Sequence, residues 1–174
     1  MENGRDAGSV TLRPMTRELC HALYRHFERD PETFMDMSLF EPFVYDAQWV
    51  DGYFDKQQRL GRVVFAIMCG EKVVGEVKLW NIDREARECV LGIHLQNDAV
   101  KNRGIGTRSE RLALQYAFDE LKMQTVKADA VFKNVRSQRV LEKVGFKLIG
   151  QDEMYRYYRL DKRDFAKLQT EDGI

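Results

Sequence analysis

The chain has 174 residues, of which 44% are hydrophobic and 32% charged, and its 28 basic and 28 acidic side chains cancel. This length suits one domain with a full hydrophobic core, so we predict a single domain over residues 1–174 with a flexible tail at residues 1–8. The balanced charge excludes a global attraction to nucleic acid or anionic lipid. We therefore expect neither a nucleic-acid partner nor a membrane partner.

The three cysteines, Cys20, Cys69 and Cys89, are scattered through patterns typical of buried core. An odd, dispersed set supports neither a disulfide framework nor a zinc site, so we predict no metal. No apolar run approaches the ~20 residues that span a bilayer, and the first residues lack the apolar segment of a signal peptide. Together these features indicate a cytoplasmic protein.

The front of the chain predicts a strand, a helix and a second helix after an acidic segment. Residues 10–15 form the strand, with Pro14 near its end. Thr16 can cap the first helix, which Asp30-Pro31 ends. Asp46 can cap the second. The apolar faces of the two helices are Leu19, Ala22, Leu23, His26 and Phe27, and Trp49, Val50, Tyr53 and Phe54.

Three strands and a long helix follow. Residues 63–69 and 73–80 are β-rich runs around the turn Gly70-Glu71-Lys72, which predicts a hairpin, and residues 88–95 form the third strand. A capping box of Thr107 and Glu110 is expected to start the helix. Its apolar residues repeat at helical spacing: Leu114, Ala117, Phe118 and Leu121.

The last third predicts a strand parallel to residues 88–95, because a helix connects the two. Residues 125–132 alternate in polarity as this strand requires. Asn134 can cap a short helix that runs through Val144 and ends at Gly145. Residues 146–149 and 154–160 predict a closing hairpin, and Phe165 and Leu168 lie in a helical tail.

The segment between the strand at 88–95 and the long helix predicts an anion site. Gly104 and Gly106 allow a tight turn whose amides approach a ligand, and the positive end of the helix dipole favours phosphate. Lys101 and Arg103 add charge. A dinucleotide fingerprint fits poorly, since Asp129 falls inside the next strand. A Walker loop fails, since Gly106-Thr107-Arg108 lacks its lysine.

The segment Lys101-Asn102-Arg103-Gly104-Ile105-Gly106 resembles the pyrophosphate loop of the GCN5-related N-acetyltransferases, with lysine in place of the usual first residue. Residues 134–146 resemble the Asn-x-x-Ser…Gly-Phe segment of that superfamily, in the form of its RimJ/RimL-type branch. The resemblance implies an α+β fold. A central, mostly antiparallel sheet would contain one parallel strand-helix-strand unit at the cleft for acetyl-CoA, the co-substrate.

The resemblance also implies which residues hold the coenzyme. Backbone groups of Ile93 to Leu95 would hold the pantetheine arm, and Asn134 with its helix would form the far side. Arg136, Arg139 and Lys143 are candidates for the 3′-phosphate. The full set of expected coenzyme residues is Ile93, His94, Leu95, Lys101, Asn102, Arg103, Gly104, Ile105, Gly106, Thr107, Asn134, Ser137 and Arg139.

Acetyl transfer to an amine needs a neutral nitrogen, a polarised thioester and an acid for the leaving thiolate. Glu88 and His94 on the central strand are the candidate bases. Ser137 is the candidate acid, because it matches the serine of the RimJ/RimL-type branch. The tyrosine common in the superfamily is absent, since Leu141 occupies its position.

The acceptor is expected to be a cationic amine, such as a peptide or protein N-terminus or a polyamine-like molecule. Residues 28–55 carry eight carboxylates against Arg29, interleaved with aromatics, and such a field attracts cations. The candidate acceptor residues are Asp36, Phe40, Glu41 and Tyr45. Alternatives are a catalytically silent acyl-CoA-binding module and, more distantly, a dinucleotide-binding protein. We also expect that the chain can form a homodimer.

Overall fold

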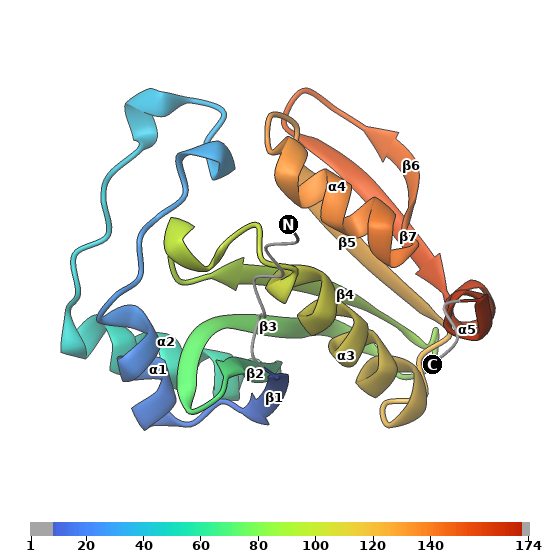
Figure 1. The fold of residues 1–174 in the computed structure, drawn as a ribbon, viewed down its shortest axis with the longest axis horizontal. Helices are drawn as coiled ribbons and strands as arrows, with labels where there is room; N and C mark the ends of the chain where they lie inside the picture. The colour runs from blue at the N-terminus through green and yellow to red at the C-terminus, as the bar shows by residue number, and fades with distance from the viewer. Residues whose placement is uncertain (1–8, 172–174) are drawn as a thin grey trace, which may run out of the picture.

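The computed structural model describes residues 9–171, which form a seven-stranded sheet with helices on both faces (Figure 1). The predicted tail at residues 1–8 lies outside the described residues. The strands are β1 (Val10–Pro14), β2 (Val63–Cys69), β3 (Lys72–Asp83), β4 (Glu88–Leu95), β5 (Thr125–Val131), β6 (Lys147–Gln151) and β7 (Tyr155–Asp161). The helices are α1 (Arg17–Tyr24), α2 (Ala47–Arg59), α3 (Ile105–Asp119), α4 (Val135–Val144) and α5 (Lys162–Glu171), with short 3-10 turns η1 (Pro31–Thr33), η2 (Met37–Leu39) and η3 (Asp98–Val100).

The sheet has the order β1-β2-β3-β4-β5-β7-β6. Strands β1 to β4 pair antiparallel in sequence, β4 and β5 pair parallel, and β5, β7 and β6 pair antiparallel. The predicted hairpins and the predicted parallel strand-helix-strand unit β4-α3-β5 are therefore confirmed. Pro14 ends the edge strand β1, where its missing N–H disrupts no central pairing.

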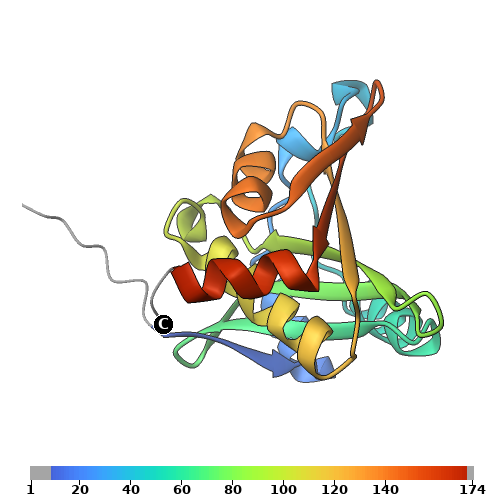
Figure 2. The same cartoon turned by 90° about the vertical axis from the view of Figure 1, so that its right-hand side faces the viewer.

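The parallel pair at the centre of the sheet is short. In the described sheet, three residue pairs join β4 to β5, from Glu88↔Thr125 to Val90↔Lys127. Beyond them β5 pairs with β7 along its length, while β4 stays with β3. Figure 2 shows β5 and β7 turning away from β3 and β4. The C-terminal half of β4 therefore has a sheet partner on its β3 side and none on its β5 side among the described residues.

Two hydrophobic cores lie on opposite faces of the sheet. The larger core contains the buried faces of α3, α4 and α5, represented by Leu114, Leu141 and Phe165. The smaller core contains α1 and α2, represented by Leu23 and Val50, which pack on β2. Because the side chains of a strand alternate between faces, residues of β4 that face α1 and α2 lie opposite those that face α3.

Side-chain caps explain where three of the helices begin. Thr16, Asp46 and Asn134 accept backbone N–H bonds at the starts of α1, α2 and α4, as predicted.

Two other predictions are wrong. Helix α1 ends at Tyr24, so His26 and Phe27 follow it, and Asp30 with Pro31 begins the η1 turn, where Asp30 accepts from Glu32 N.

The predicted capping box at α3 is also wrong. The helix begins at Ile105, with Gly104 as the N-cap at φ 76° and no side-chain cap in the described structure. Thr107 therefore lies inside the first turn, and Glu110 points into the protein instead of back to the cap. Leu121 lies beyond the end of the helix at Asp119.

Glu110 is a buried carboxyl group in the middle of the domain. It is 1% exposed, and neither carboxyl oxygen has a hydrogen-bond partner among the described residues. Burial disfavours the charged form and raises the pKa of Glu110 to about 8. The chain therefore carries a proton on this group at neutral pH when folded and releases it when unfolded.

Two further findings concern the described part of the chain. Cys20 and Cys89 are buried in the cores, as predicted, and Cys69 is half-buried. Within residues 9–171, every helix is too short or too polar to cross a membrane.

We expect Glu110→Leu to stabilise the protein increasingly as pH rises. Between the ordinary pKa of 4.5 and the folded pKa of about 8, the unfolded chain loses this proton while the folded chain keeps it, so wild-type stability falls with pH. The variant has no carboxyl group at this position and therefore does not lose stability in this way. Its free energy of unfolding should exceed that of the wild type by about 2 kcal/mol at pH 8, and the full pKa shift sets an upper limit of roughly 5 kcal/mol.

Urea denaturation between pH 4.5 and 8.5 measures this difference. The exposed Glu120 at the end of α3 supplies the control variant Glu120→Leu, whose effect should not change with pH in this range. A stability difference for Glu110→Leu that is the same at pH 5 and pH 8 contradicts the assignment.

Candidate active site

The free edge of β4 forms the centre of the site. Ile93, His94 and Leu95 lie after the last residue paired to β5 and are half-buried. On the other side of β4, Gly75 allows a close approach of β3, because a Cβ there would lie 2.6 Å from the His94 carbonyl oxygen. Backbone groups of β4 thus face the separation between the strands, where an extended ligand can pair with them.

The loop before α3 has the geometry of an anion site. Asn102 and Gly104 adopt positive φ values of 58° and 76°, and α3 begins without a side-chain cap in the described structure. The first amides of the helix, at Ile105 to Thr107, are therefore available to a ligand. A Cβ added at Gly106 would meet only Val140 Cγ1, at 3.9 Å, in the described structure. The approach to these amides is open.

Lys101 is held by carboxylates. Its ammonium lies 2.8 Å from Asp30 Oδ2 and 2.8 Å from Asp98 Oδ1, and its side chain is 11% exposed. Arg136 of α4 lies 3.5 Å from Asp30 and 3.6 Å from Asp98. The Lys101 charge that we predicted beside the loop is therefore paired with the carboxylates of Asp30 and Asp98. Arg103, the second predicted cation, is exposed.

The start of α4 faces this loop from the other half of the sheet. Asn134 Oδ1 accepts from the Ser137 backbone N–H at 3.1 Å, so its side chain is engaged as the cap. Ser137 is half-buried in the first turn, and Arg139 is exposed. These positions are compatible with the predicted far wall of a coenzyme site.

A polar cluster surrounds His94 on the α1 and α2 side of the sheet. Its imidazole Nε2 lies 3.4 Å from the Tyr24 hydroxyl, and Nδ1 lies 3.7 Å from Glu76 Oε1. The Tyr53 hydroxyl donates a short hydrogen bond to Glu76 Oε1, and Lys78 Nζ lies 3.1 Å from the same oxygen. Burial lowers the pKa of His94, an effect that Lys78 adds to and Glu76 opposes.

Aromatic rings enclose this cluster. Tyr24 contacts five rings at centroid distances of 5.3 to 6.0 Å, and Trp49 stacks on Tyr53 at 5.4 Å. The rings around Tyr24 are Phe27, Phe43, Trp49, Tyr53 and His94. No functional role was predicted from the sequence for Glu76, Tyr24 or Phe27. The available signal was a charged residue, Glu76, between Gly75 and Val77 in an apolar strand.

Glu88, the other candidate base, lies away from this cluster. It is at the start of β4, where the strand pairs with β5, and its carboxylate is 2.9 Å from Lys127 Nζ. His94 lies six positions farther along β4, which is roughly 20 Å along an extended strand. The structure therefore does not bring the two candidate bases together.

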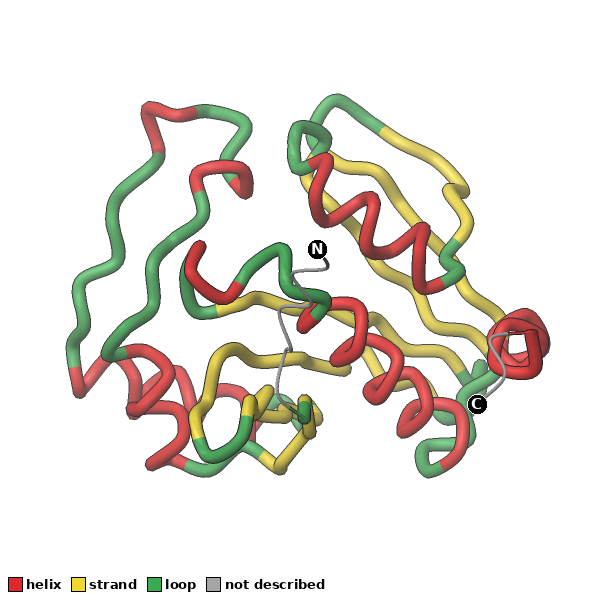
Figure 3. Tube along the Cα trace, in the orientation of Figure 1, coloured by secondary structure: helices red, strands yellow, loops and turns green. Residues whose placement is uncertain are grey.

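The segment that connects α1 to α2 extends away from these helices and lies across from α4, β6 and β7 (Figure 3). Asp36 accepts from Ser38 N and Oγ, and these bonds lower its pKa. Phe40 packs edge-on against Phe34 at 5.5 Å. Glu41 lies in a polar pocket of about 480 Å³ with Phe43, Asp46 and Trp49, so one expected acceptor residue adjoins the aromatic cluster.

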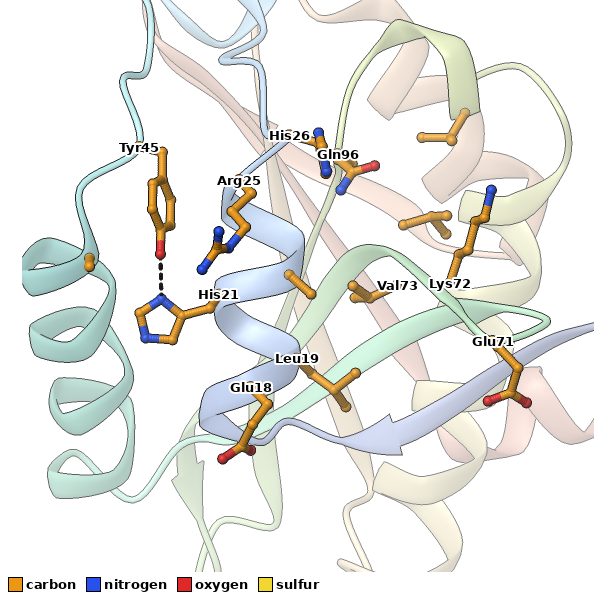
Figure 4. Close-up of a pocket in the computed structure, with 14 residues that line it drawn as sticks. Glu18, Leu19, His21, Arg25, His26, Tyr45, Glu71, Lys72, Val73 and Gln96 are labelled. Atoms are coloured by element: carbon orange, nitrogen blue, oxygen red, sulfur yellow. Dashed lines mark hydrogen bonds between the residues drawn. The ribbon is translucent and has the colours of Figure 1, made fainter.

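The Tyr45 side chain points toward α1 (Figure 4). Its hydroxyl is 2.9 Å from His21 Nδ1, and Arg25 lies over its ring at 5.1 Å (Figure 4). This places it on a groove of about 960 Å³ along the outer side of α1, which Gln96 and Val100 also line. Tyr45 and Glu41 thus line different pockets of the described structure.

The acidic stretch is less negative than its sequence indicates. Asp51 and Asp55 each contact Arg17, at 2.7 and 2.5 Å, and Asp30 contacts Lys101 and Arg136. Cations from outside residues 28–55 thus pair with three of the eight carboxylates. The described residues also contain no group of three His, Cys, Asp or Glu side chains that could hold a metal ion.

Residues 9–147 match the family model described as the acetyltransferase (GNAT) domain, so the chain belongs to this family of acyltransferase enzymes. The mixed sheet with one parallel pair agrees with that fold. Acetyl-CoA is the acyl donor of the family. The uncapped start of α3, the open space at Gly106 and the free edge of β4 fit it.

Two relatives by sequence lie within this family. The chain is 37% identical over 76 residues to "Probable N-acetyltransferase YjcK" of Bacillus subtilis (strain 168), a match that covers 44% of the chain and 42% of that protein. It is 25% identical over 156 residues to spermidine N(1)-acetyltransferase of Escherichia coli (strain K12), which covers 83% of the chain and 76% of that protein. The match therefore spans less than half of YjcK.

Solved structures share the fold at lower identity. The aminoglycoside acetyltransferase AAC(6′)-Ib in complex with coenzyme A has a TM-score of 0.75 at 18% identity, over 92% of this chain and 99% of that one. Spermidine N-acetyltransferase from Vibrio cholerae in complex with coenzyme A and spermine has a TM-score of 0.72 at 17% identity, over 90% and 98%.

We expect Gly106→Val to weaken acetyl-CoA binding at least tenfold without unfolding the protein. The added methyl groups obstruct the approach of phosphate to the helix amides, whereas the free protein has room beside Val140. Isothermal titration with acetyl-CoA measures the affinity, and thermal denaturation measures the stability.

The matched control is Gly52→Val. Gly52 is also a helical glycine, and an added Cβ has no neighbour within 4 Å in the described structure. The control should keep wild-type affinity. A folded Gly106→Val protein with unchanged affinity would show that the loop does not bind the pyrophosphate.

Proposed function

We propose that this enzyme acetylates a cationic primary amine, such as a polyamine or a basic peptide N-terminus, by direct attack within a ternary complex. The observation that supports this proposal is the His94 imidazole at the free edge of β4, enclosed by aromatic rings that adjoin a polar pocket lined by Glu41, Asp46 and Arg29. The relatives that act on spermidine make a polyamine the first acceptor to test.

We assign the base to His94 in preference to Glu88. Its lowered pKa keeps the imidazole neutral near pH 7, so it can accept a proton. Its side chain is 28% exposed, which gives the acceptor access. Glu88 is paired with Lys127 and lies far along the strand.

The reaction then balances as follows. The amine nitrogen attacks the thioester carbonyl carbon, a carbon–nitrogen bond forms and the carbon–sulfur bond breaks. The nitrogen loses its proton to His94, and the coenzyme A thiolate takes a proton from an acid. Ser137 in the first turn of α4 remains our candidate for that acid.

Three further predictions remain part of this proposal: the single domain, the homodimer and the RimJ/RimL-type branch. The family match supports the superfamily, and the relatives reported above are YjcK and spermidine acetyltransferases. We therefore rank small cationic amines ahead of protein N-termini as acceptors to test.

A panel of amines with a free-thiol readout tests the proposed function. The panel contains spermidine, a basic peptide with a free N-terminus, a primary arylamine that is uncharged at neutral pH and the anionic amino acid glutamate. We expect the highest kcat/KM for a cationic acceptor, because the Glu41 and Asp46 carboxylates attract its charge. A preference for the neutral or anionic amine contradicts the proposal. Acetyl-CoA binding without thiol release from any amine would support a silent acyl-CoA-binding module instead.

We expect the double variant Glu41→Gln/Asp46→Asn to raise the KM for spermidine roughly three- to tenfold, with the KM for acetyl-CoA unchanged. Asparagine keeps the α2 cap that Asp46 supplies, so the change removes charge with little effect on the helix. Steady-state kinetics at low and at 0.5 M salt measure it, because salt screens such an attraction.

The control is Glu85→Gln/Glu120→Gln, which removes two exposed carboxylates after β3 and after α3. It should leave both Michaelis constants unchanged. Equal effects of the two double variants would mean that net charge, and not this pocket, governs capture of the acceptor.

A further inference from the structure

Glu76 is a charged residue in the interior of the protein. It is 0% exposed on β3, and its register partner on β4 is His94. Residues opposite each other in an antiparallel pair point to the same face, with Cβ atoms about 5 Å apart. The strand pairing therefore places the Glu76 and His94 side chains next to each other on the same face of the sheet.

The carboxylate is anchored through one of its two oxygens. Oε1 accepts a hydrogen bond from the Tyr53 hydroxyl and lies 3.1 Å from Lys78 Nζ. The same ammonium donates a hydrogen bond to the Tyr53 oxygen at 3.0 Å. Oε2 is buried and has no hydrogen-bond partner within residues 9–171. A buried carboxylate with an unused oxygen is costly, so a stability role explains it poorly.

We infer that Glu76 is a positioning residue for His94: it holds the imidazole with Nδ1–H toward the carboxylate and stabilises the imidazolium that forms when the acceptor amine gives up its proton. This inference rests on the proposed function, in which His94 is the base. The separation of 3.7 Å between Nδ1 and Oε1 is within ion-pair range once the ring is charged.

The tautomer follows from this arrangement. With hydrogen on Nδ1, the lone pair is on Nε2, which accepts from the Tyr24 hydroxyl at 3.4 Å. When Nε2 takes the proton, that hydroxyl can reverse and accept from it, because a hydroxyl serves in either role. The carboxylate thus orients the imidazole as the carboxylate of a hydrolase triad does.

Four ionisable groups face His94 from the elements packed around it. Glu76 and Lys78 come from β3, Tyr24 from α1 and Tyr53 from α2. The two charges act in opposite directions, since Glu76 raises and Lys78 lowers the pKa of His94. Removing Glu76 or Lys78 one at a time should therefore shift the pKa of His94 in opposite directions. A general disturbance of the hydrogen bonds among these residues would not produce opposite shifts.

The test compares Glu76→Gln with Lys78→Met, using spermidine as the acceptor. We expect Glu76→Gln to lower kcat roughly ten- to a hundredfold and to move the acid limb of the kcat/KM profile to lower pH. Lys78→Met disturbs the same hydrogen bonds and should move that limb to higher pH. Acetyl-CoA affinity should be unchanged in both, which checks that the coenzyme site is intact.

A second readout needs no turnover. Nitrogen-15 chemical shifts of His94 in the free protein, assigned with His94→Gln, report the tautomer and the pKa. We expect one Nδ1–H tautomer in the wild type and a mixture in Glu76→Gln. Shifts of the same sign in both variants, or an unchanged tautomer in Glu76→Gln, overturn the inference.

His94→Gln separates this inference from the base assignment. If His94→Gln keeps wild-type turnover, His94 is not the base and the proposed mechanism fails, whatever Glu76 does to the ring. If His94→Gln is inactive while Glu76→Gln keeps its kcat and tautomer, the base stands and the role of Glu76 is refuted.

Discussion

The structure depends on the separation of β4 from β5 after three residue pairs. A parallel pair normally continues along both strands, and its end leaves polar backbone groups of β4 to be satisfied by something else. This makes Ile93 to Leu95 our candidate ligand edge. The α3 amides lie at one end of this edge, and the aromatic cluster around His94 lies on the side of α1 and α2.

The two faces of β4 have different chemical tasks. The face toward α3 is apolar and belongs to the larger core, which fixes the helix whose first turn presents the amides. The face toward α1 and α2 has a polar centre within aromatic walls, formed by Glu76, His94, Tyr24 and Tyr53. In the proposed mechanism, the alternation of side chains along this strand therefore separates the donor side from the acceptor side.

Much of this architecture could be predicted from local patterns. The caps at Thr16, Asp46 and Asn134, the hairpins and the parallel unit follow from turn residues and periodicity. The failures have physical causes. Glu110 fits a capping-box pattern, but its direction depends on how the turn at Gly104 sets the phase of α3. The cluster at Glu76 depends on β3–β4 register and on contacts with helices more than twenty residues away, which no local pattern specifies.

The charges at the mouth of the site have a mechanical consequence. Three residue pairs of the sheet and the larger core join its two halves, and the contacts of Arg136 with Asp30 and Asp98 connect the halves across the separation of β4 and β5. Each such partly exposed ion pair contributes about 0–1 kcal/mol. The apolar packing shared by the two halves therefore dominates their relative position, and these ion pairs add only a weak electrostatic contact across the separation.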